Sequence, residues 1–209
     1  MKCRVTLSLG LLFLGAIARA DDWLDWSPLP PIPSELGVAG PFVGVHEGRL
    51  IVAGGANFPK PVWETEKIWR EAIYVLDLRH PDDGWVESGR LVDPAGYGTA
   101  VSLADGLLCI GGNDAERVMD TVFLLRWGGS SVERELLPSL PEPLCYASSA
   151  VLGDHIYVAG GQSGPGLETA SGRVWRLDWA ERNQADSFGW EEMSSFPGPP
   201  RAFLSLATQ

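Results

Sequence analysis

The stretch Leu50-Ile-Val-Ala-Gly54-Gly55 recurs twice in this chain, as Leu107-Leu-Cys-Ile-Gly111-Gly112 and as Ile156-Tyr-Val-Ala-Gly160-Gly161. Each copy is a short apolar run that ends in a pair of glycines, and successive pairs lie 57 and 49 residues apart. A period of about 50 residues indicates a repeat fold in which each unit packs against its neighbours. The spacing of the glycine pairs therefore decides the fold class.

The residues around each glycine pair predict four antiparallel strands per repeat. A first strand meets the apolar run in a hairpin, whose turn pairs a glycine with an acidic residue: Glu47-Gly48, Asp105-Gly106 and Gly153-Asp154. Such dipeptides supply the positive φ angles that two-residue turns require. The third strands are predicted at residues 72–77, 121–126 and 173–178, and the fourth at 85–91, 132–138 and 190–197. We therefore predict an all-β, kelch-type β-propeller with blades at residues 38–91, 96–138 and 145–197.

The two ends of the repeat region predict single strands without a blade of their own. Trp26-Ser-Pro-Leu-Pro30 has the pattern of a fourth strand, and residues 201–209 have that of the first strand of a further blade. Unpaired edge strands invite aggregation, and a six-bladed ring at ~50 residues per blade needs roughly 300 residues. We therefore expect an incomplete propeller from a fragment or a truncated gene, and not a well-behaved monomer.

Residues 1–20 have the features of a secretory signal peptide. Lys2 and Arg4 precede a mostly apolar run at residues 5–17, and Ala18-Arg19-Ala20 supplies small residues at a cleavage site. The run is too short for a membrane-spanning helix, which needs about 20 apolar residues. We expect export to the periplasm or out of the cell, and a propeller domain at residues 21–209.

The chain is acidic, with a formal net charge of −11 that becomes −14 on cleavage, because three basic and no acidic residues leave. An acidic surface repels nucleic acids and anionic membranes, so neither is an expected partner. Cys109 and Cys145 lie in apolar, strand-like runs, which favours two buried thiols. A disulfide between them stays open, because an exported protein can form one.

Motifs for nucleotide, hydrolase and metal chemistry are missing from the sequence. It has neither a G-x-x-x-x-G-K-[ST] nor a G-x-S-x-G motif. The histidines, His46, His80 and His155, lack the spacing of metal ligands. We expect no metal and no cofactor.

The longest loop after a glycine pair, residues 56–70, is the first candidate for ligand binding. Loops after the second strand converge at the mouth of a propeller channel, where ligands bind. Asn57, Trp63 and Lys67 combine amide, aromatic and charged groups that suit a sugar. The alternative is an ordered loop in which Trp63 packs on its own blade.

Segments that precede the first strands supply two further candidates. Tyr97 precedes the first strand of the second blade, with Tyr146 as its equivalent in the third. Arg201 follows Pro199-Pro200, where a basic residue can bind a substrate carboxylate with two hydrogen bonds. The alternative for Arg201 is an ion pair between blades. Asn113 and Gln162, which follow the other glycine pairs, are better explained as turn residues than as ligand contacts.

Several segments resemble the bacterial N-acetylneuraminate epimerases, also called sialic acid mutarotases. The resemblance runs through Gly37-Val-Ala-Gly-Pro-Phe, Ile51-Val-Ala-Gly-Gly-Ala-Asn-Phe and Gly96-Tyr-Gly-Thr-Ala-Val-Ser-Leu. In the usual order of that family, a ring of six blades, these blades come last. Residues 145–200 are similar to its opening blade. The chain thus resembles a cyclically permuted branch, which a ring permits because its ends meet at one blade.

The resemblance implies an isomerase that interconverts the α and β anomers of N-acetylneuraminic acid, a small acidic sugar. Opening and closing the ring needs a general acid/base and a cation for the carboxylate. The family's Gly-Glu…Arg segment has no match here, so the catalytic residues stay unknown and we expect this chain alone to be inactive. A second interpretation is an exported kelch module that binds glycans or proteins without chemistry.

Overall fold

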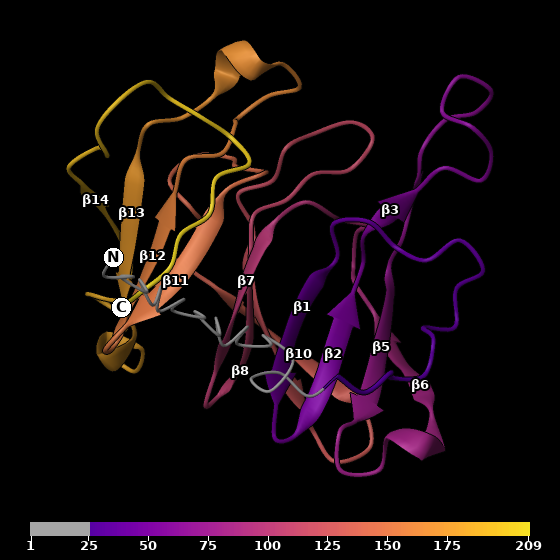
Figure 1. The fold of residues 1–209 in the computed structure, drawn as a ribbon. Coiled ribbons are helices and arrows are strands. Elements are labelled where there is room, and N and C mark those ends of the chain that lie inside the picture. Colours follow the sequence, from indigo (N-terminus) through magenta and orange to yellow (C-terminus); the bar gives the residue numbers. More distant parts are fainter. Residues whose placement is uncertain (1–25) are drawn as a thin grey trace, which may run out of the picture.

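Residues 26–209 are the part of the chain that the computed structural model describes, and the predicted signal peptide at residues 1–20 lies outside them. They form three four-stranded antiparallel sheets and one two-stranded sheet (Figure 1). The first blade contains β1 (Phe42–His46), β2 (Arg49–Ala53), β5 (Ala72–Asp77) and β6 (Trp85–Arg90). The second contains β7 (Thr99–Leu103), β8 (Gly106–Ile110), β9 (Val122–Trp127) and β10 (Val132–Leu137). The third contains β11 (Ser148–Leu152), β12 (His155–Ala159), β13 (Val174–Asp178) and β14 (Trp190–Met193).

The strands of each blade pair in chain order, which is the up-and-down pattern of a propeller blade. The prediction of an all-β propeller with three four-stranded blades is therefore confirmed. The long loop of the first blade adds the two-stranded sheet of β3 (Ala56–Asn57) and β4 (Ile68–Trp69). Three short 3-10 helices complete the described elements: η2 (Pro81–Asp83), η3 (Leu167–Thr169) and η4 (Trp179–Glu181). Within residues 26–209, no helix has the length and apolar character to span a membrane.

One predicted hairpin turn is shifted by a residue. Leu103 pairs with Gly106, so the turn between β7 and β8 is Ala104-Asp105 and not Asp105-Gly106. Gly106 is instead the first residue of β8, with φ of +152°, and a Cβ there would lie 2.6 Å from the carbonyl oxygen of Leu125. A glycine is needed at this position because the backbone of β9 passes too close for a side chain. The dipeptide pattern alone does not reveal this requirement.

The prediction that residues 26–30 and 201–209 form strands is wrong. Both segments nevertheless make hydrogen bonds with the neighbouring blade at the positions that the repeat predicts. Residues 26–30 and 201–209 contain no strand, because neither has a second strand to complete a ladder among the described residues. The Trp85 indole donates to the carbonyl oxygen of Pro30 at 2.8 Å, as that of Trp190 does to Pro138 at 3.0 Å. Pro138 follows the fourth strand of the second blade, so Pro30 occupies the equivalent place beside the first.

Two apolar clusters fill the spaces between the blades. All five residues of β8 are buried, because the second blade is covered on both of its faces. Leu107 and Cys109 belong to the cluster shared with the first blade, and Leu108 and Ile110 to the cluster shared with the third. Strand side chains alternate between the faces of a sheet, so one strand supplies both clusters.

The glycine pairs join each blade to the segment that leads into the next one. In every case the N–H of the second glycine donates to a carbonyl oxygen of that segment: Gly55 to Ala95 at 2.7 Å, Gly112 to Leu144 at 2.8 Å and Gly161 to Arg201 at 2.9 Å. A Cβ on the first glycine of each pair would lie 2.2, 2.2 and 2.6 Å from the same three oxygens. The motif is therefore required by a close backbone approach between blades.

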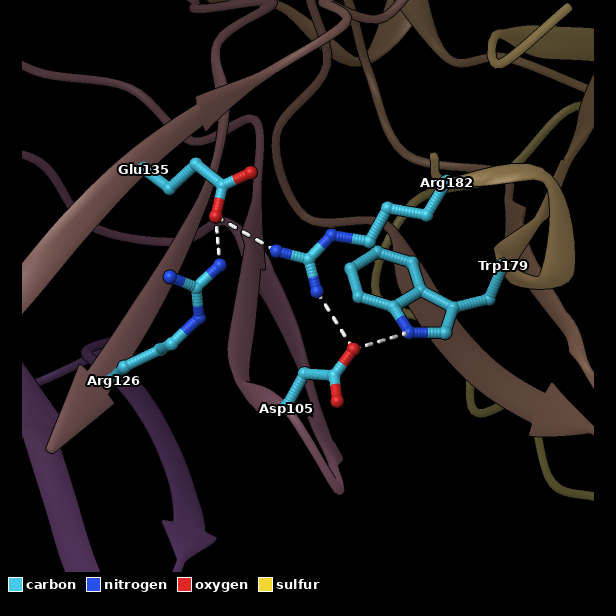
Figure 2. A network of polar contacts seen from close by, with 5 residues as sticks. All are labelled: Asp105, Arg126, Glu135, Trp179 and Arg182. Carbon is cyan, nitrogen blue, oxygen red and sulfur yellow. Dashed lines mark hydrogen bonds and ion pairs between the residues drawn. The ribbon is translucent and has the colours of Figure 1, made fainter. Parts of the chain in front are cut away.

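Charged side chains join the second and third blades at the opposite end of the strands (Figure 2). Glu135 binds both Arg126 and Arg182, the latter at 2.7 Å. Asp105 accepts from Arg182 at 2.6 Å and from the Trp179 indole at 3.2 Å. This end carries the hairpin turns at residues 47–48, 104–105 and 153–154, and we call it the hairpin face.

Candidate functional site

The loops that follow β2, β8 and β12 gather at the other end of the blades, uppermost in Figure 1, which we call the glycine face. A groove of about 640 Å³ lies between these loops. All three blades line it: Glu66, Lys67 and Trp69 from the first, residues 113–118 from the second, and residues 145–146 and 162–165 from the third. This is the place where the sequence predicts the channel mouth.

Three aromatic residues hold equivalent backbone positions at the inner rim of this face. Tyr97, Tyr146 and Phe203 have φ of 56°, 54° and 58°. The N–H of Tyr97 donates to the Gly40 carbonyl oxygen at 2.6 Å, that of Tyr146 to Tyr97 at 2.7 Å, and that of Phe203 to Tyr146 at 2.9 Å. A bulky residue in the left-handed region is strained, and the hydrogen bonds from blade to blade hold the strain. Such strain is typical of functional sites.

The rings of these residues form a continuous row that begins at Trp69. The ring centroids of Trp69 and Tyr97 are 5.7 Å apart, those of Tyr97 and Tyr146 5.0 Å, and those of Tyr146 and Phe203 4.4 Å. A Cβ at Gly40, which holds the same position in the first blade, would lie 2.4 Å from the Tyr97 ring. The glycine therefore makes room for the row of rings. Two members of the row, Trp69 and Tyr146, line the groove.

Lys67 lies beside this row, directly before β4 of the two-stranded sheet, which begins at Ile68. Its Nζ donates to the Tyr97 hydroxyl at 3.2 Å and lies 4.5 Å from the centroid of that ring. The rings of Trp69 and Phe58 are 5.3 and 5.5 Å from the same atom. Three aromatic faces thus surround the ammonium group, a favourable arrangement for a cation.

Two amide oxygens at equivalent positions of neighbouring blades have no hydrogen-bond partner among residues 26–209. Gln162 is 4% exposed, and its Oε1 is buried and unpaired, as is Oδ1 of Asn113. The Gln162 amide nitrogen donates to the Gly164 carbonyl oxygen at 2.7 Å, which fixes the side chain. Both residues line the groove. A buried acceptor without a donor costs free energy unless a ligand or water supplies one.

Burial also changes the acidity of the groups at the floor of the groove. The pKa of Cys145 is raised by burial to about 11, so its thiol stays protonated. Burial, with smaller effects of Cys145 and Tyr97, raises the pKa of Tyr146, and a hydrogen bond with the Asn113 amide opposes this shift. These groups therefore present neutral hydrogen-bonding atoms to a ligand. No cluster of three or more histidine, cysteine or acidic residues that suits a metal occurs within residues 26–209.

The structure brings together two of the five predicted binding residues, Lys67 and Tyr97. Asn57 is turned away, because its amide donates to the carbonyl oxygens of Leu36 and Gly37 and fixes the segment before β1. Trp63 is 80% exposed at the tip of the same loop. Neither lines the groove, and their assignment to a substrate stays a prediction.

Arg201 also lies outside the groove. Its guanidinium donates to the carbonyl oxygens of Pro197 at 2.7 Å and Pro199 at 3.2 Å, and it stacks on the Phe196 ring at 4.8 Å. Its backbone oxygen receives the Gly161 bond described above. No ion pair joins Arg201 to another blade within residues 26–209, and its contact with a substrate carboxylate stays a prediction.

Sequence reasoning gave Asn113 and Gln162 mainly a turn role and did not select Tyr146. The signal that identifies them is their register in the repeat. Tyr146 is the equivalent of Tyr97, and the two amides directly follow the second and third glycine pairs. Their exposure to one groove depends on how the blades are placed around the channel, which a single repeat does not specify.

Comparison with known families agrees with this architecture. The third blade contains a kelch motif, whose model matches residues 143–178. The model of the N-acetylneuraminate epimerase family matches residues 16–133, more than half of the chain. The chain therefore belongs to the N-acetylneuraminate epimerase family.

Individual relatives carry the same family name. The N-acetylneuraminate epimerase of Salmonella enteritidis is 39% identical over 108 residues, which cover 45% of this chain and 27% of the relative. That of Brucella suis is 34% identical over 131 residues, covering 56% of this chain and 33% of the relative. The chain thus spans about a quarter to a third of the length of the curated relatives that it matches. The cyclic permutation stays a prediction.

Proposed function

We propose that the groove on the glycine face binds an acidic sugar, N-acetylneuraminic acid. We further propose that the full-length protein interconverts the α and β anomers of this sugar. The observation that carries the proposal is the pair of buried, unpaired amide oxygens of Asn113 and Gln162. Sugar hydroxyls are donors that satisfy such acceptors. The names of the relatives supply the identity of the sugar.

The aromatic residues of the groove support the same ligand class. Trp69 and Tyr146 line the groove, and aromatic faces pack well on the C–H faces of a pyranose ring. A groove of about 640 Å³ is within the range of pockets that hold small molecules. A combination of apolar faces with a few fixed polar atoms is what a sugar requires.

Within this chain, the groove favours binding over catalysis. Asp114 accepts hydrogen bonds from the backbone N–H groups of Glu116 and Arg117 at 2.8 Å each, so its carboxylate supports the loop. Glu66 and Glu116 are exposed, whereas a general acid is held in a fixed position beside the reacting group. We therefore expect the proton transfers of ring opening to need residues beyond those described here. A binding module without chemistry is the alternative for this chain.

Proton NMR of freshly released α-anomer tests the proposal. We expect the full-length protein to speed conversion to the β-anomer and this chain alone to bind the sugar without changing the rate. Binding without any acceleration by the full-length protein would favour the non-catalytic alternative. If neither protein binds the sugar, the proposal is wrong.

We also propose that the protein acts outside the cytoplasm. The basic residues, the apolar run and the Ala18-Arg19-Ala20 site in residues 1–20 support this location. N-terminal sequencing of the protein from its native host is expected to begin at Asp21. A mature protein that retains Met1 and stays in the cytoplasm would contradict the proposal.

A further inference from the structure

Lys67 is the cation of the groove that has no acidic partner in the part of the chain that the structure describes. The groove is lined by two basic residues, and the other, Arg117, is paired with Asp93 at 3.2 Å and Asp114 at 3.8 Å. Lys67 makes no ion pair within 4.0 Å among the described residues, although the chain holds 27 acidic residues. Its Nζ donates one hydrogen bond, to the Tyr97 hydroxyl. An ammonium group has three donors, so two remain for a ligand.

The surroundings of Lys67 keep the charge in place without neutralising it. The rings of Phe58, Trp69 and Tyr97 lie 4.5 to 5.5 Å from Nζ, and aromatic faces stabilise a cation while accepting none of its protons strongly. The Tyr97 hydroxyl fixes the position of the amine. A cation that is held in this way is prepared to receive an anion at low cost in side-chain entropy.

We propose that Lys67 is the anchor for the carboxylate of the bound sugar and makes the groove selective for an acidic sugar over a neutral one. The inference rests on the proposed function, that the groove binds a sugar. Arg201, which the sequence predicts for this part, lies outside the groove with its guanidinium bound to Pro197 and Pro199. In N-acetylneuraminic acid the carboxylate is attached to the anomeric carbon. Lys67 therefore also places the reacting carbon close to the Tyr97 hydroxyl.

The test compares N-acetylneuraminic acid with its neutral methyl ester, each titrated into this chain and followed by NMR. The wild-type chain is expected to bind the acid about ten- to a hundredfold more tightly than the ester, the value of a charge-assisted hydrogen bond. Lys67→Met is expected to lower affinity for the acid by that factor and to leave the ester within about twofold. Lys67→Arg is expected to keep most of the preference, because it keeps the charge.

Lys60→Met is the matched control, because it removes the same charge from an exposed position of the same loop. It is expected to retain the preference for the acid, which separates a local anchor from a general effect of net charge. Thermal unfolding checks that each variant is folded, and the side-chain resonances of Tyr97 and Trp69 are expected to shift on binding of the acid to the wild-type chain.

The outcomes separate the two proposals. If the wild-type chain binds acid and ester equally, or if Lys67→Met keeps the preference, the Lys67 assignment is overturned and the sugar site stands. If Lys60→Met loses the preference as completely as Lys67→Met, the anchor is overturned in favour of overall charge. If the wild-type chain binds neither compound, the proposed function fails and the anchor fails with it.

Discussion

The two ends of the blades use their polar side chains in different ways. On the hairpin face, the charged groups satisfy one another across the junction of the second and third blades (Figure 2). Arg182, whose side chain is 15% exposed, bridges Glu135 and Asp105 at 2.7 and 2.6 Å. A network with few free donors or acceptors stabilises the junction and offers little to a ligand.

On the glycine face, backbone groups join the blades and side chains are left with unused hydrogen-bonding capacity. Two sets of backbone hydrogen bonds join the blades: those of the glycine pairs, and those that run from Phe203 through Tyr146 and Tyr97 to Gly40. Lys67 and the amide oxygens of Asn113 and Gln162 have capacity left for a ligand. The difference indicates that the hairpin face of the three blades is organised for stability and the glycine face for binding. Changes on the two faces should therefore have different effects.

The largest effect is expected from the backbone junction on the glycine face. Gly111→Ala places a Cβ 2.2 Å from the carbonyl oxygen of Leu144 at a φ of +61°, so the two blades must move apart. We expect the free energy of unfolding to fall by about 3 kcal/mol or more. Urea unfolding followed by tryptophan fluorescence measures this change.

Gly189→Ala is the control, because a Cβ there meets no atom of the described residues within 4 Å. It is expected to change the free energy of unfolding by less than about 0.5 kcal/mol. Equal effects of the two substitutions would show that the glycine pair does not hold the blades together.

The next effect concerns the network of Figure 2. Arg182→Met removes the shared partner of Glu135 and Asp105, and we expect a loss of about 2 kcal/mol in the free energy of unfolding. The loss should be smaller in 1 M salt, which screens the ion pairs of the wild type. Sugar binding on the other face should not change. Arg79→Met, at a side chain that is 60% exposed, is expected to leave the free energy of unfolding nearly unchanged, because solvent screens this pair.

These two faces were predictable from the sequence to different degrees. The glycine pairs, the apolar alternation and the turn dipeptides repeat with the blades, so the sheets and their order follow from local pattern. Gly106 shows the limit of such pattern, because the glycine that suggests a turn instead admits the backbone of β9. Residues 26–30 and 201–209 show a second limit. Their sequence has the pattern of a strand, but a strand forms only beside a partner strand.

The binding site depends on relations that no local pattern contains. Lys67 meets Tyr97 across 30 residues, and Gln162 and Asn113 come together from different blades. The position of Arg201 in the repeat predicts a place in the site, and the structure shows its guanidinium bound to the carbonyl oxygen of Pro197 outside the groove. Residue type and repeat position identify the candidates. Which of them line the groove depends on how the blades are placed relative to one another.

A smaller effect on stability, with a specific effect on binding, is expected from Tyr97→Phe. This change removes the hydroxyl that accepts from Lys67 and keeps the ring in its row. We expect the free energy of unfolding to change by about 1 kcal/mol or less, and the preference for the acid over its ester to fall severalfold, because Nζ loses its fixed position. The double variant with Lys67→Met should bind no more weakly than Lys67→Met alone. Additive losses would mean that the two residues contact the sugar independently.

The smallest effect is a pH dependence on the hairpin face. The Asp77 carboxylate accepts hydrogen bonds from the side chain and backbone N–H of Arg79, and these bonds, with the nearby charge of Arg49, lower its pKa from 3.8 to about 2. A lowered pKa in the folded state means that the contribution of Asp77 to stability is complete above pH 4 and is lost as the pH falls towards 2. In Asp77→Asn, the thermal midpoint should therefore fall less steeply between pH 4 and 2 than in the wild type.

Asp82→Asn is the control, because Asp82 is an exposed acid without an ion pair among the described residues. This variant should keep the wild-type slope. An unchanged slope in Asp77→Asn would show that this pair is screened by solvent, and that the stabilising charges of the hairpin face are confined to the junction at Arg182.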